Sequence, residues 1–151
     1  MRARLILILT LFAFTAGTSW AQQAKTSAKP AASQKAKAIT HRIVYDMSVA
    51  DTAQHAGLMR QLNNIKRGWP DAQIEIVVHG KALNLLVTDK TTKATAIKDL
   101  QAKGVVFAAC ENTMRVQKVV KEQLLPQVTT VPMGIGELVL KQEEGWSYIK
   151  F

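Results

Sequence analysis

The residue best suited to do chemistry in this sequence is Cys110, the single cysteine among 151 residues. It follows the apolar run Gly104–Ala109 (GVVFAA) and precedes a polar segment, so we expect it where a buried strand ends and a helix begins. Free amides and the dipole at a helix N-terminus stabilise a thiolate, and they can also hold an anionic sulfur species such as a persulfide. The alternative is an inert core residue, because unpaired cysteines are often buried.

His79 is the natural partner for this thiol. It ends the apolar run Ala72–Val78, and Gly80 after it permits a sharp change of direction. If the two strands are neighbours, His79 and Cys110 lie at the same edge of the sheet, where an imidazole can assist thiolate formation. A histidine at the end of a strand can instead serve only to hydrogen-bond the backbone.

The residues that flank Cys110 complete the candidate site. We expect Asn112 to cap the following helix and to shape the thiol pocket, with Gly80, Thr113 and Arg115 as further binding residues. The spacing from Cys110 to Arg115 equals that of a rhodanese loop, but Thr113 stands where such a loop uses glycine, so the spacing alone is a weak signal. Glu111, next to the thiol, should oppose its ionisation.

Apolar runs that alternate with helical patterns must position these residues. The expected strands are Arg42–Met47, Ala72–Val78, Gly104–Ala109, Val128–Val131 and Ser147–Ile149. Four helices are expected. The first is capped by Ser48 or Asp51 and ends at Gly68, and the second begins at Ala94 and is stopped by Gly104. The third and fourth span Asn112–Leu124 and Gly134–Glu144. Strands that alternate with helices indicate an α/β layer fold with a mostly parallel five-stranded sheet, whose ligands bind beyond the carboxyl ends of the strands.

The pattern also indicates further details of these elements. Leu83–Val87 is apolar and fits either a helical turn or a packed loop. In the expected helix Asn112–Leu124, we place Met114, Val119 and Val120 on the inward face. His55 falls in the middle of the first helix, on its expected outer surface.

The charge of the chain is concentrated before the expected fold. The formal net charge is +9, from 20 Lys and Arg against 11 Asp and Glu, but six of the basic residues and none of the acidic ones precede Ile39. The body is therefore nearly balanced, which argues against a nucleic-acid-binding domain.

The N-terminus has the pattern of a targeting segment. Arg2 and Arg4 precede the apolar run Leu5–Ala16, and the small residues Ser19 and Ala21 follow, so residues 1–21 are expected to be a secretory signal peptide. The run is shorter than the roughly 20 residues that span a bilayer, so we expect no stable membrane insertion after cleavage. Residues 22–38, rich in Ala, Lys, Ser and Gln, should be a flexible linker. The predicted location is the periplasm.

Three segments together resemble a known family. VVHGKAL (Val77–Leu83), GVVFAACENTM (Gly104–Met114) and VPMGIGELVLKQEEGWSYIKF (Val131–Phe151) are similar to the DsrE/DsrF-like family of the YchN-like fold, over most of the expected domain at residues 39–151. The resemblance implies a three-layer sandwich that forms homotrimers or homohexamers. It also implies sulfur relay, with Cys110 carrying the sulfur as a persulfide and with His79 and Asn112 lining the site.

We therefore expect an exported sulfur carrier that uses Cys110 and no cofactor or metal. With one cysteine there is no internal resolving thiol, so a donor or acceptor protein or a small thiol must act with it. The alternative is a non-catalytic oligomeric module that binds a small ligand or a protein and contains a buried, inert cysteine. A copper site formed by Cys110, His79 and Met133 is a more distant possibility.

Overall fold

Five strands form one sheet at the centre of the fold. A computed structural model describes residues 40–151, and its strands are β1 (Arg42–Met47), β2 (Gln73–Val78), β3 (Val105–Cys110), β4 (Thr129–Val131) and β5 (Ser147–Lys150). Their order across the sheet is β4-β3-β2-β1-β5, and every pairing between neighbours is parallel. The predicted parallel five-stranded sheet is confirmed.

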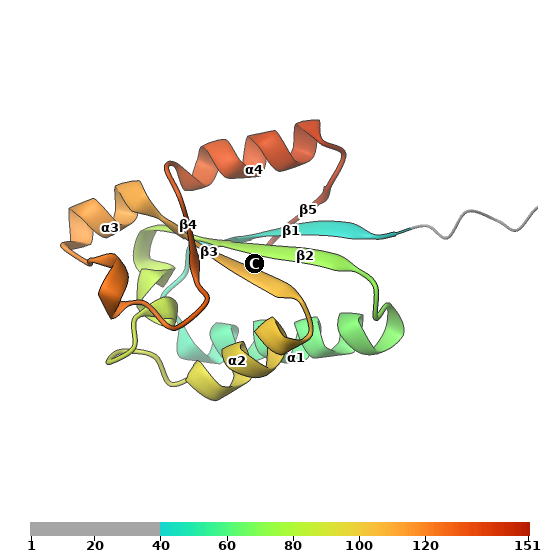
Figure 1. Ribbon diagram of the computed structural model, residues 1–151, viewed down its shortest axis with the longest axis horizontal. Coiled ribbons are helices and arrows are strands. Elements are labelled where there is room, and N and C mark those ends of the chain that lie inside the picture. Colours follow the sequence, from blue (N-terminus) through green and yellow to red (C-terminus); the bar gives the residue numbers. More distant parts are fainter. Residues whose placement is uncertain (1–39) are drawn as a thin grey trace, which may run out of the picture. The chain divides into compact units, whose positions relative to one another are not determined.

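Helices cover both faces of this sheet (Figure 1). The α-helices are α1 (Thr52–Gly68), α2 (Ala94–Ala102), α3 (Glu111–Gln117) and α4 (Gly134–Glu143), and two 3-10 helices are η1 (Gly80–Leu86) and η2 (Lys121–Gln123). The chain crosses from β1 to β4 in one direction and then returns to place β5 beside β1. Because such crossovers are right-handed, the return puts α4 on the face opposite α1 and α2. The result is the expected three-layer sandwich.

The two faces of the sheet have cores of different size. Ile43, Tyr45 and Met47 of β1 belong to a large cluster that includes Leu58 and Leu62 of α1. The alternate residues face α4, where the buried apolar cluster contains only Val44, Val77 and Leu138. This second face therefore has room for buried polar groups, and it carries the candidate site.

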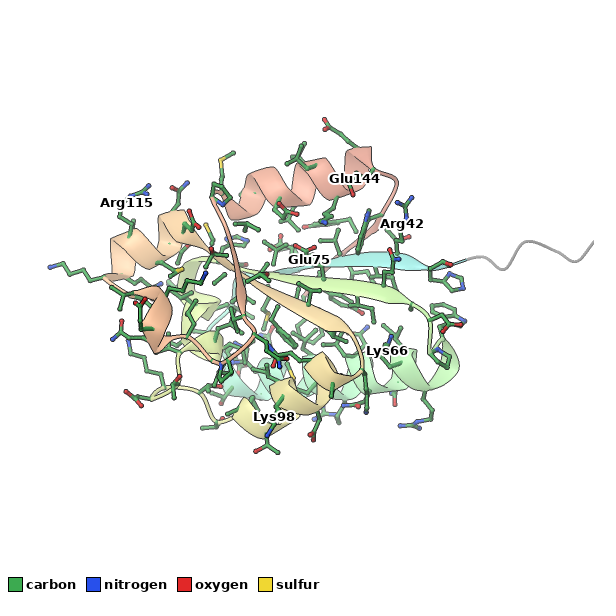
Figure 2. The ribbon with its side chains drawn as sticks, in the orientation of Figure 1. Arg42, Lys66, Glu75, Lys98, Arg115 and Glu144 are labelled. Atoms are coloured by element: carbon green, nitrogen blue, oxygen red, sulfur yellow. The ribbon has the colours of Figure 1, made fainter. Side chains whose placement is uncertain are left out.

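Glu75 of β2 is one of these polar groups, and it lies beneath α4 (Figure 2). Its carboxylate accepts from Lys141 Nζ at 3.0 Å, and Lys141 also pairs with Glu137 one turn earlier. Burial raises the pKa of Glu75 by more than the neighbouring lysine lowers it. This cluster attaches α4 to the sheet.

Helix α1 begins where the sequence indicates, but one of its side chains lies elsewhere than expected. Asp51 is the N-cap, and its carboxylate accepts from the Ala53 N–H at 2.8 Å. The prediction that His55 is on the surface is wrong: it is buried, and its Nε2 donates to the Val49 carbonyl oxygen at 2.8 Å. The backbone that leads into the helix offers this acceptor, and sequence periodicity does not reveal such a contact.

Helix α3 is shorter than the expected Asn112–Leu124. It ends at Gln117 because Lys118 adopts a left-handed conformation with φ of 55°, and the Val119 N–H then bonds back to the Met114 carbonyl at 2.9 Å. Met114 and Val119 are buried as predicted, but Val120 is 56% exposed, so its inward placement is wrong. The early stop keeps α3 at the carboxyl edge of the sheet.

Tyr45 provides a test of the larger core. Its side chain is fully buried, and its hydroxyl is without a hydrogen-bond partner in the part of the chain that is described. Replacing it with phenylalanine should raise the free energy of unfolding by about 1 kcal/mol, because a buried unsatisfied hydroxyl is removed. Urea denaturation measures the change. The matched Tyr148→Phe variant removes a hydroxyl that donates to Asp46 and should be destabilised; a loss of stability in Tyr45→Phe would contradict the prediction.

The predicted signal peptide (residues 1–21) and linker (residues 22–38) lie outside the described residues. Within residues 40–151, no helix combines the length and the apolar character that crossing a membrane requires.

Candidate functional site

Three neighbouring strands bring Asp46, His79 and Cys110 to one edge of the sheet. Asp46 lies next to the last residue of β1, His79 directly follows β2, and Cys110 ends β3. Val78 is paired with Ala109, so the next residues, His79 and Cys110, lie side by side. Because side chains alternate along a strand, all three share the face that α4 covers.

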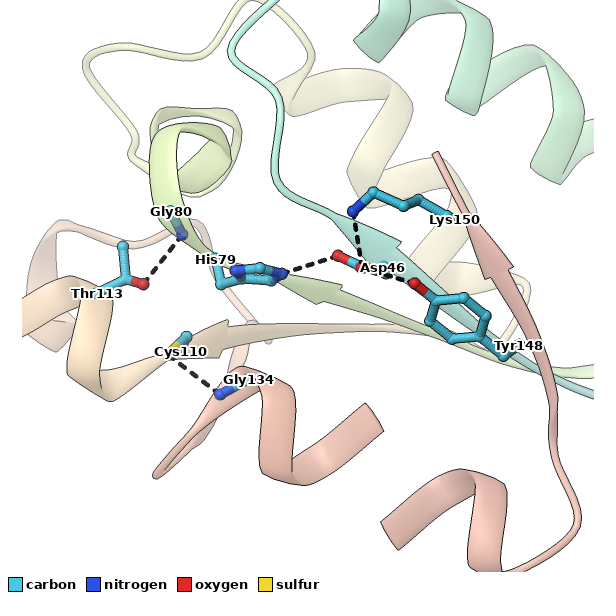
Figure 3. A network of polar contacts seen from close by, with 8 residues as sticks. All are labelled: Asp46, His79, Gly80, Cys110, Thr113, Gly134, Tyr148 and Lys150. Atoms are coloured by element: carbon cyan, nitrogen blue, oxygen red, sulfur yellow. Dashed lines mark hydrogen bonds and ion pairs between the residues drawn. The ribbon is translucent and has the colours of Figure 1, made fainter. Parts of the chain in front are cut away.

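Two helices begin beside the sulfur atom of Cys110. Cys110 is the N-cap of α3, and Gly134 is the first residue of α4. The Gly134 N–H donates to Cys110 Sγ at 3.2 Å (Figure 3). The expectation that Cys110 marks a strand-to-helix junction is confirmed, and the start of a second helix adds to it.

The hydrogen bonds around Cys110 favour its thiolate. Burial raises the pKa of the thiol, but the Thr113 hydroxyl and N–H and the N–H groups of Gly134 and Asn112 lower it, and they prevail. The pKa of Cys110 therefore lies below its ordinary value. The side chain is only 4% exposed, so these donors act where water screens them little.

Gly134 allows α4 to approach this closely. A Cβ atom at this position would lie 3.1 Å from His79 Cβ and 3.3 Å from Cys110 Cβ. The side chains of His79 and Cys110 thus meet around a single backbone position, and an added methyl group would have to push one of them or the helix away. The close approach of α4 to His79 and Cys110 therefore requires glycine at position 134.

His79 is tied to a polar network that extends to the edge strand β5. Its Nε2 bonds Asp46 Oδ1 at 2.8 Å, while Asp46 Oδ2 accepts from Tyr148 OH at 2.8 Å and from Lys150 Nζ at 3.0 Å (Figure 3). Burial raises the pKa of Asp46, but the hydrogen bonds from Lys150, Tyr148 and His79 lower it below its ordinary value. Asp46 is therefore a buried carboxylate, and the imidazole nitrogen that faces it carries a proton.

The predicted pairing of His79 with Cys110 takes an indirect form. The two residues are adjacent, yet the described residues include no hydrogen bond between the imidazole and the sulfur, and the Nε2 atom of His79 bonds Asp46. The thiolate is instead stabilised by helix N-termini and by Thr113. His79 is 18% exposed and remains accessible beside the sulfur.

The other predicted site residues lie on the outer side of Cys110. Gly80 adopts a φ of 55°, and its N–H donates to the Thr113 hydroxyl oxygen at 3.0 Å. Both residues and Asn112 border a cavity of about 360 Å³, lined by Gly80, Lys81, Asn112, Thr113, Val116 and Gln117. Thr113 thus connects this cavity to the sulfur.

The side chains of Asn112 and Arg115 bond each other on the surface of α3. The prediction that Asn112 caps the helix is wrong, since Cys110 is the N-cap; the Asn112 side chain is exposed and accepts from Arg115. Arg115 is exposed on α3 (Figure 2). Glu111 is also exposed, and its carboxylate accepts from the Thr130 hydroxyl.

Sequence reasoning missed Tyr148 and Lys150 as parts of this site, and it placed Asp46 and Gly134 near the carboxyl ends of the expected strands without giving either a role. Asp46 has a visible signal, because it is the single charged residue in the segment Ile43–Met47. Tyr148 and Lys150 lie two residues apart on β5 and so share a face of the sheet. Nothing in the sequence pairs them with Asp46, because the pairing depends on β5 lying next to β1.

The arrangement is suited to nucleophilic sulfur chemistry. It contains a stabilised thiolate and, next to it, an imidazole held by a carboxylate. Across residues 40–151, no group of three or more His, Cys, Asp or Glu side chains is placed to hold a metal ion.

Several solved structures are similar to this chain. A protein of unknown function from Methanobacterium thermoautotrophicum is 30% identical, with a TM-score of 0.71, and the match covers 74% of this chain and 99% of that one. A conserved protein of unknown function from Bacteroides thetaiotaomicron is 20% identical over 73% of this chain and 94% of that one, with a TM-score of 0.61. The YchN protein from E. coli shares the fold at 9% identity, with a TM-score of 0.63 and coverage of 75% and 100%.

Two comparisons that use only the amino-acid sequence give different results. No curated protein matches the chain. The model of the DsrE/DsrF-like family matches residues 11–151, which include every strand and helix of the fold. The chain therefore belongs to the DsrE/DsrF-like family, which is associated with sulfur relay.

Proposed function

We propose that this protein is an exported carrier of sulfane sulfur, which it holds as a persulfide on Cys110. The convergence of N–H and hydroxyl donors from the starts of α3 and α4 on one sulfur atom is the observation that supports this function. Donors in this arrangement stabilise an anionic sulfur, and a persulfide is anionic like a thiolate. An inert core cysteine needs no such donors.

The proposed loading step transfers one sulfur atom. The Cys110 thiolate attacks the outer sulfur of a donor, the new bond forms at Sγ, and the sulfur–sulfur bond of the donor breaks. The donor leaves with that electron pair, as sulfite from thiosulfate or as a thiolate from an organic persulfide. Cys110 becomes a persulfide, and no other oxidant or reductant takes part.

Release of the sulfur requires a second molecule. Cys110 is the only cysteine in the sequence, so no second thiol of the same chain can form an internal disulfide. We propose that a donor or acceptor protein or a small thiol completes the transfer. His79, adjacent to the sulfur, serves as the acid–base residue of the site, and Thr113 and Gly80 border the approach to it.

The proposal includes self-association and export. Part of the α4 surface is apolar and exposed, and the neighbouring Val106 of β3 is 41% exposed. The exposed apolar residues of this surface are Val106, Met133, Ile135, Val139 and Leu140. A homotrimer or homohexamer would cover such a surface. Export follows from the signal-peptide pattern of residues 1–21.

Intact-mass spectrometry after incubation with thiosulfate or polysulfide tests the proposal. The protein should gain the mass of one or more sulfur atoms, and a reductant should remove them. Because the chain has a single cysteine, a gain that a reductant reverses is located at Cys110. Alkylation of the native protein near neutral pH provides a second measurement and should proceed before unfolding.

The alternative function gives the opposite result. A binding module with an inert cysteine would keep its mass with either donor, and its thiol would react only after denaturation. The low exposure of Cys110 is the observation that favours this second function. An unchanged mass together with a protected thiol would therefore refute the carrier.

A further inference from the structure

His79 has no evident task in forming the thiolate of Cys110. The donors that lower the pKa of Cys110 come from Asn112, Thr113 and Gly134. The Nε2 atom of His79 points to Asp46 rather than to the sulfur. A thiolate that backbone donors already stabilise does not need a general base, so the imidazole next to it is available for another step.

The environment of His79 is suited to a proton donor. Asp46 is buried beside the ring, and its charge is retained because Tyr148 and Lys150 both donate to it. A carboxylate that accepts at Nε2 leaves Nδ1 as the nitrogen that exchanges protons with the site. The same carboxylate stabilises a positive charge on the ring, as in other triads in which an acid orients a histidine.

His79 lies next to Cys110 at the carboxyl edge of the sheet. His79 Cβ and Cys110 Cβ lie 3.1 and 3.3 Å from the same point, the place of a Cβ on Gly134. A group that protonates the sulfur leaving from a donor at Cys110 must lie close to Sγ, and His79 meets this requirement. The titratable groups around the ring are Asp46, Cys110, Tyr148 and Lys150, whereas Glu137 and Lys141 of α4 are engaged with Glu75.

We propose that His79, positioned by Asp46, donates a proton to the sulfur that leaves when Cys110 takes up a sulfane sulfur. This inference rests on the proposed function and specifies its chemistry. For an organic persulfide, the Cys110 thiolate attacks the outer sulfur and the donor sulfur–sulfur bond breaks. The inner sulfur leaves with the electron pair as a thiolate, and the His79 imidazolium protonates it to a thiol. The neutral imidazole then regains a proton from solvent.

The role of His79 makes the site selective among donors. A thiolate is a strongly basic leaving group, so its departure is accelerated when it is protonated. The sulfite that leaves thiosulfate is a much weaker base, so protonation accelerates its departure little. The Asp46–His79 pair should therefore accelerate loading from persulfides and contribute little to loading from thiosulfate. Asp46 is a positioning residue in this step, and His79 is the catalytic acid.

The test compares loading rates from glutathione persulfide and from thiosulfate by quenched intact-mass measurements. In Asp46→Asn, loading from the persulfide should slow by about tenfold to a hundredfold, while loading from thiosulfate should change by less than about twofold. The matched control is Glu75→Gln, which removes another buried carboxylate from the same face of the sheet and should affect both donors equally.

A second variant keeps the inference testable if Asp46→Asn does not fold. His79→Gln, at a partly exposed position, should show the same dependence on the donor. The double variant, with both Asp46→Asn and His79→Gln, should load sulfur from the persulfide no more slowly than the slower of the two single variants. Equal slowing with both donors, or the same selectivity in Glu75→Gln, would overturn the inference and leave Asp46 with a structural role. If the wild-type protein gains no sulfur from either donor, the proposed function itself fails.

Discussion

Replacing Cys110 with serine is expected to abolish the gain of sulfur from every donor. The chain has no other thiol to carry the atom. Serine is close to cysteine in size, and its hydroxyl can accept the hydrogen bond that the Gly134 N–H donates to Sγ. The free energy of unfolding should therefore stay within about 1 kcal/mol of the wild-type value. Intact mass after incubation with polysulfide measures the loss.

Two controls separate this result from a loss of structure. Denaturation in urea should give nearly the same midpoint for Cys110→Ser and wild type, and light scattering should give the same oligomeric mass for both. A serine variant that still gains sulfur would show that loading does not occur on Cys110. A variant that changes its oligomeric mass would show that the cysteine supports assembly instead.

Replacing Gly134 with alanine is expected to raise the pKa of Cys110 and to slow its alkylation. The new methyl group would lie 3.1 Å from His79 Cβ and 3.3 Å from Cys110 Cβ, so we expect the start of α4 and the Cys110 side chain to separate by a few tenths of an ångström. One hydrogen bond from a backbone N–H to a charged group is then weakened. Such a bond contributes about 1.5 to 3 kcal/mol, so alkylation at neutral pH should slow by about tenfold or more.

The chain offers a matched control two residues later. A Cβ on Gly136 would meet only the side chain of Met133, with the terminal Cε at 2.7 Å, and this flexible side chain can move aside. Both variants replace a glycine with alanine in the first turn of α4. Gly136→Ala should therefore retain the reactivity of wild type. Equal slowing in both variants would show that the close approach of α4 does not control the thiol.

The pH dependence of alkylation measures the pKa of Cys110 in wild type and in the variants. With its pKa held below the ordinary value of a thiol by the surrounding hydrogen-bond donors, wild-type Cys110 should stay reactive at lower pH than a free thiol. Stability gained from the folded thiolate is present above the unfolded pKa and is lost as pH falls through the folded pKa. In Gly134→Ala the midpoint of the alkylation profile should move to higher pH.

Much of the fold follows from local patterns in the sequence. Apolar runs and helix end signals located all five strands and the starts of α1 and α4, because burial of alternate residues and N-caps such as Asp51 are local properties. The length of α3 was not predictable in this way. Its end depends on Lys118, a non-glycine residue in a left-handed conformation, which the sequence pattern does not indicate.

By itself, the sequence determined the family, the parallel α/β architecture and the location of Cys110 between a buried strand and a helix. These follow from residue type and spacing along one segment at a time. The tertiary structure alone decided which groups meet at the sulfur and which hold His79. Gly134 reaches Cys110 across 24 residues, and Lys150 reaches Asp46 across 104, because α4 and β5 return to the first strands. Contacts of this kind depend on strand order and register, which no local pattern encodes.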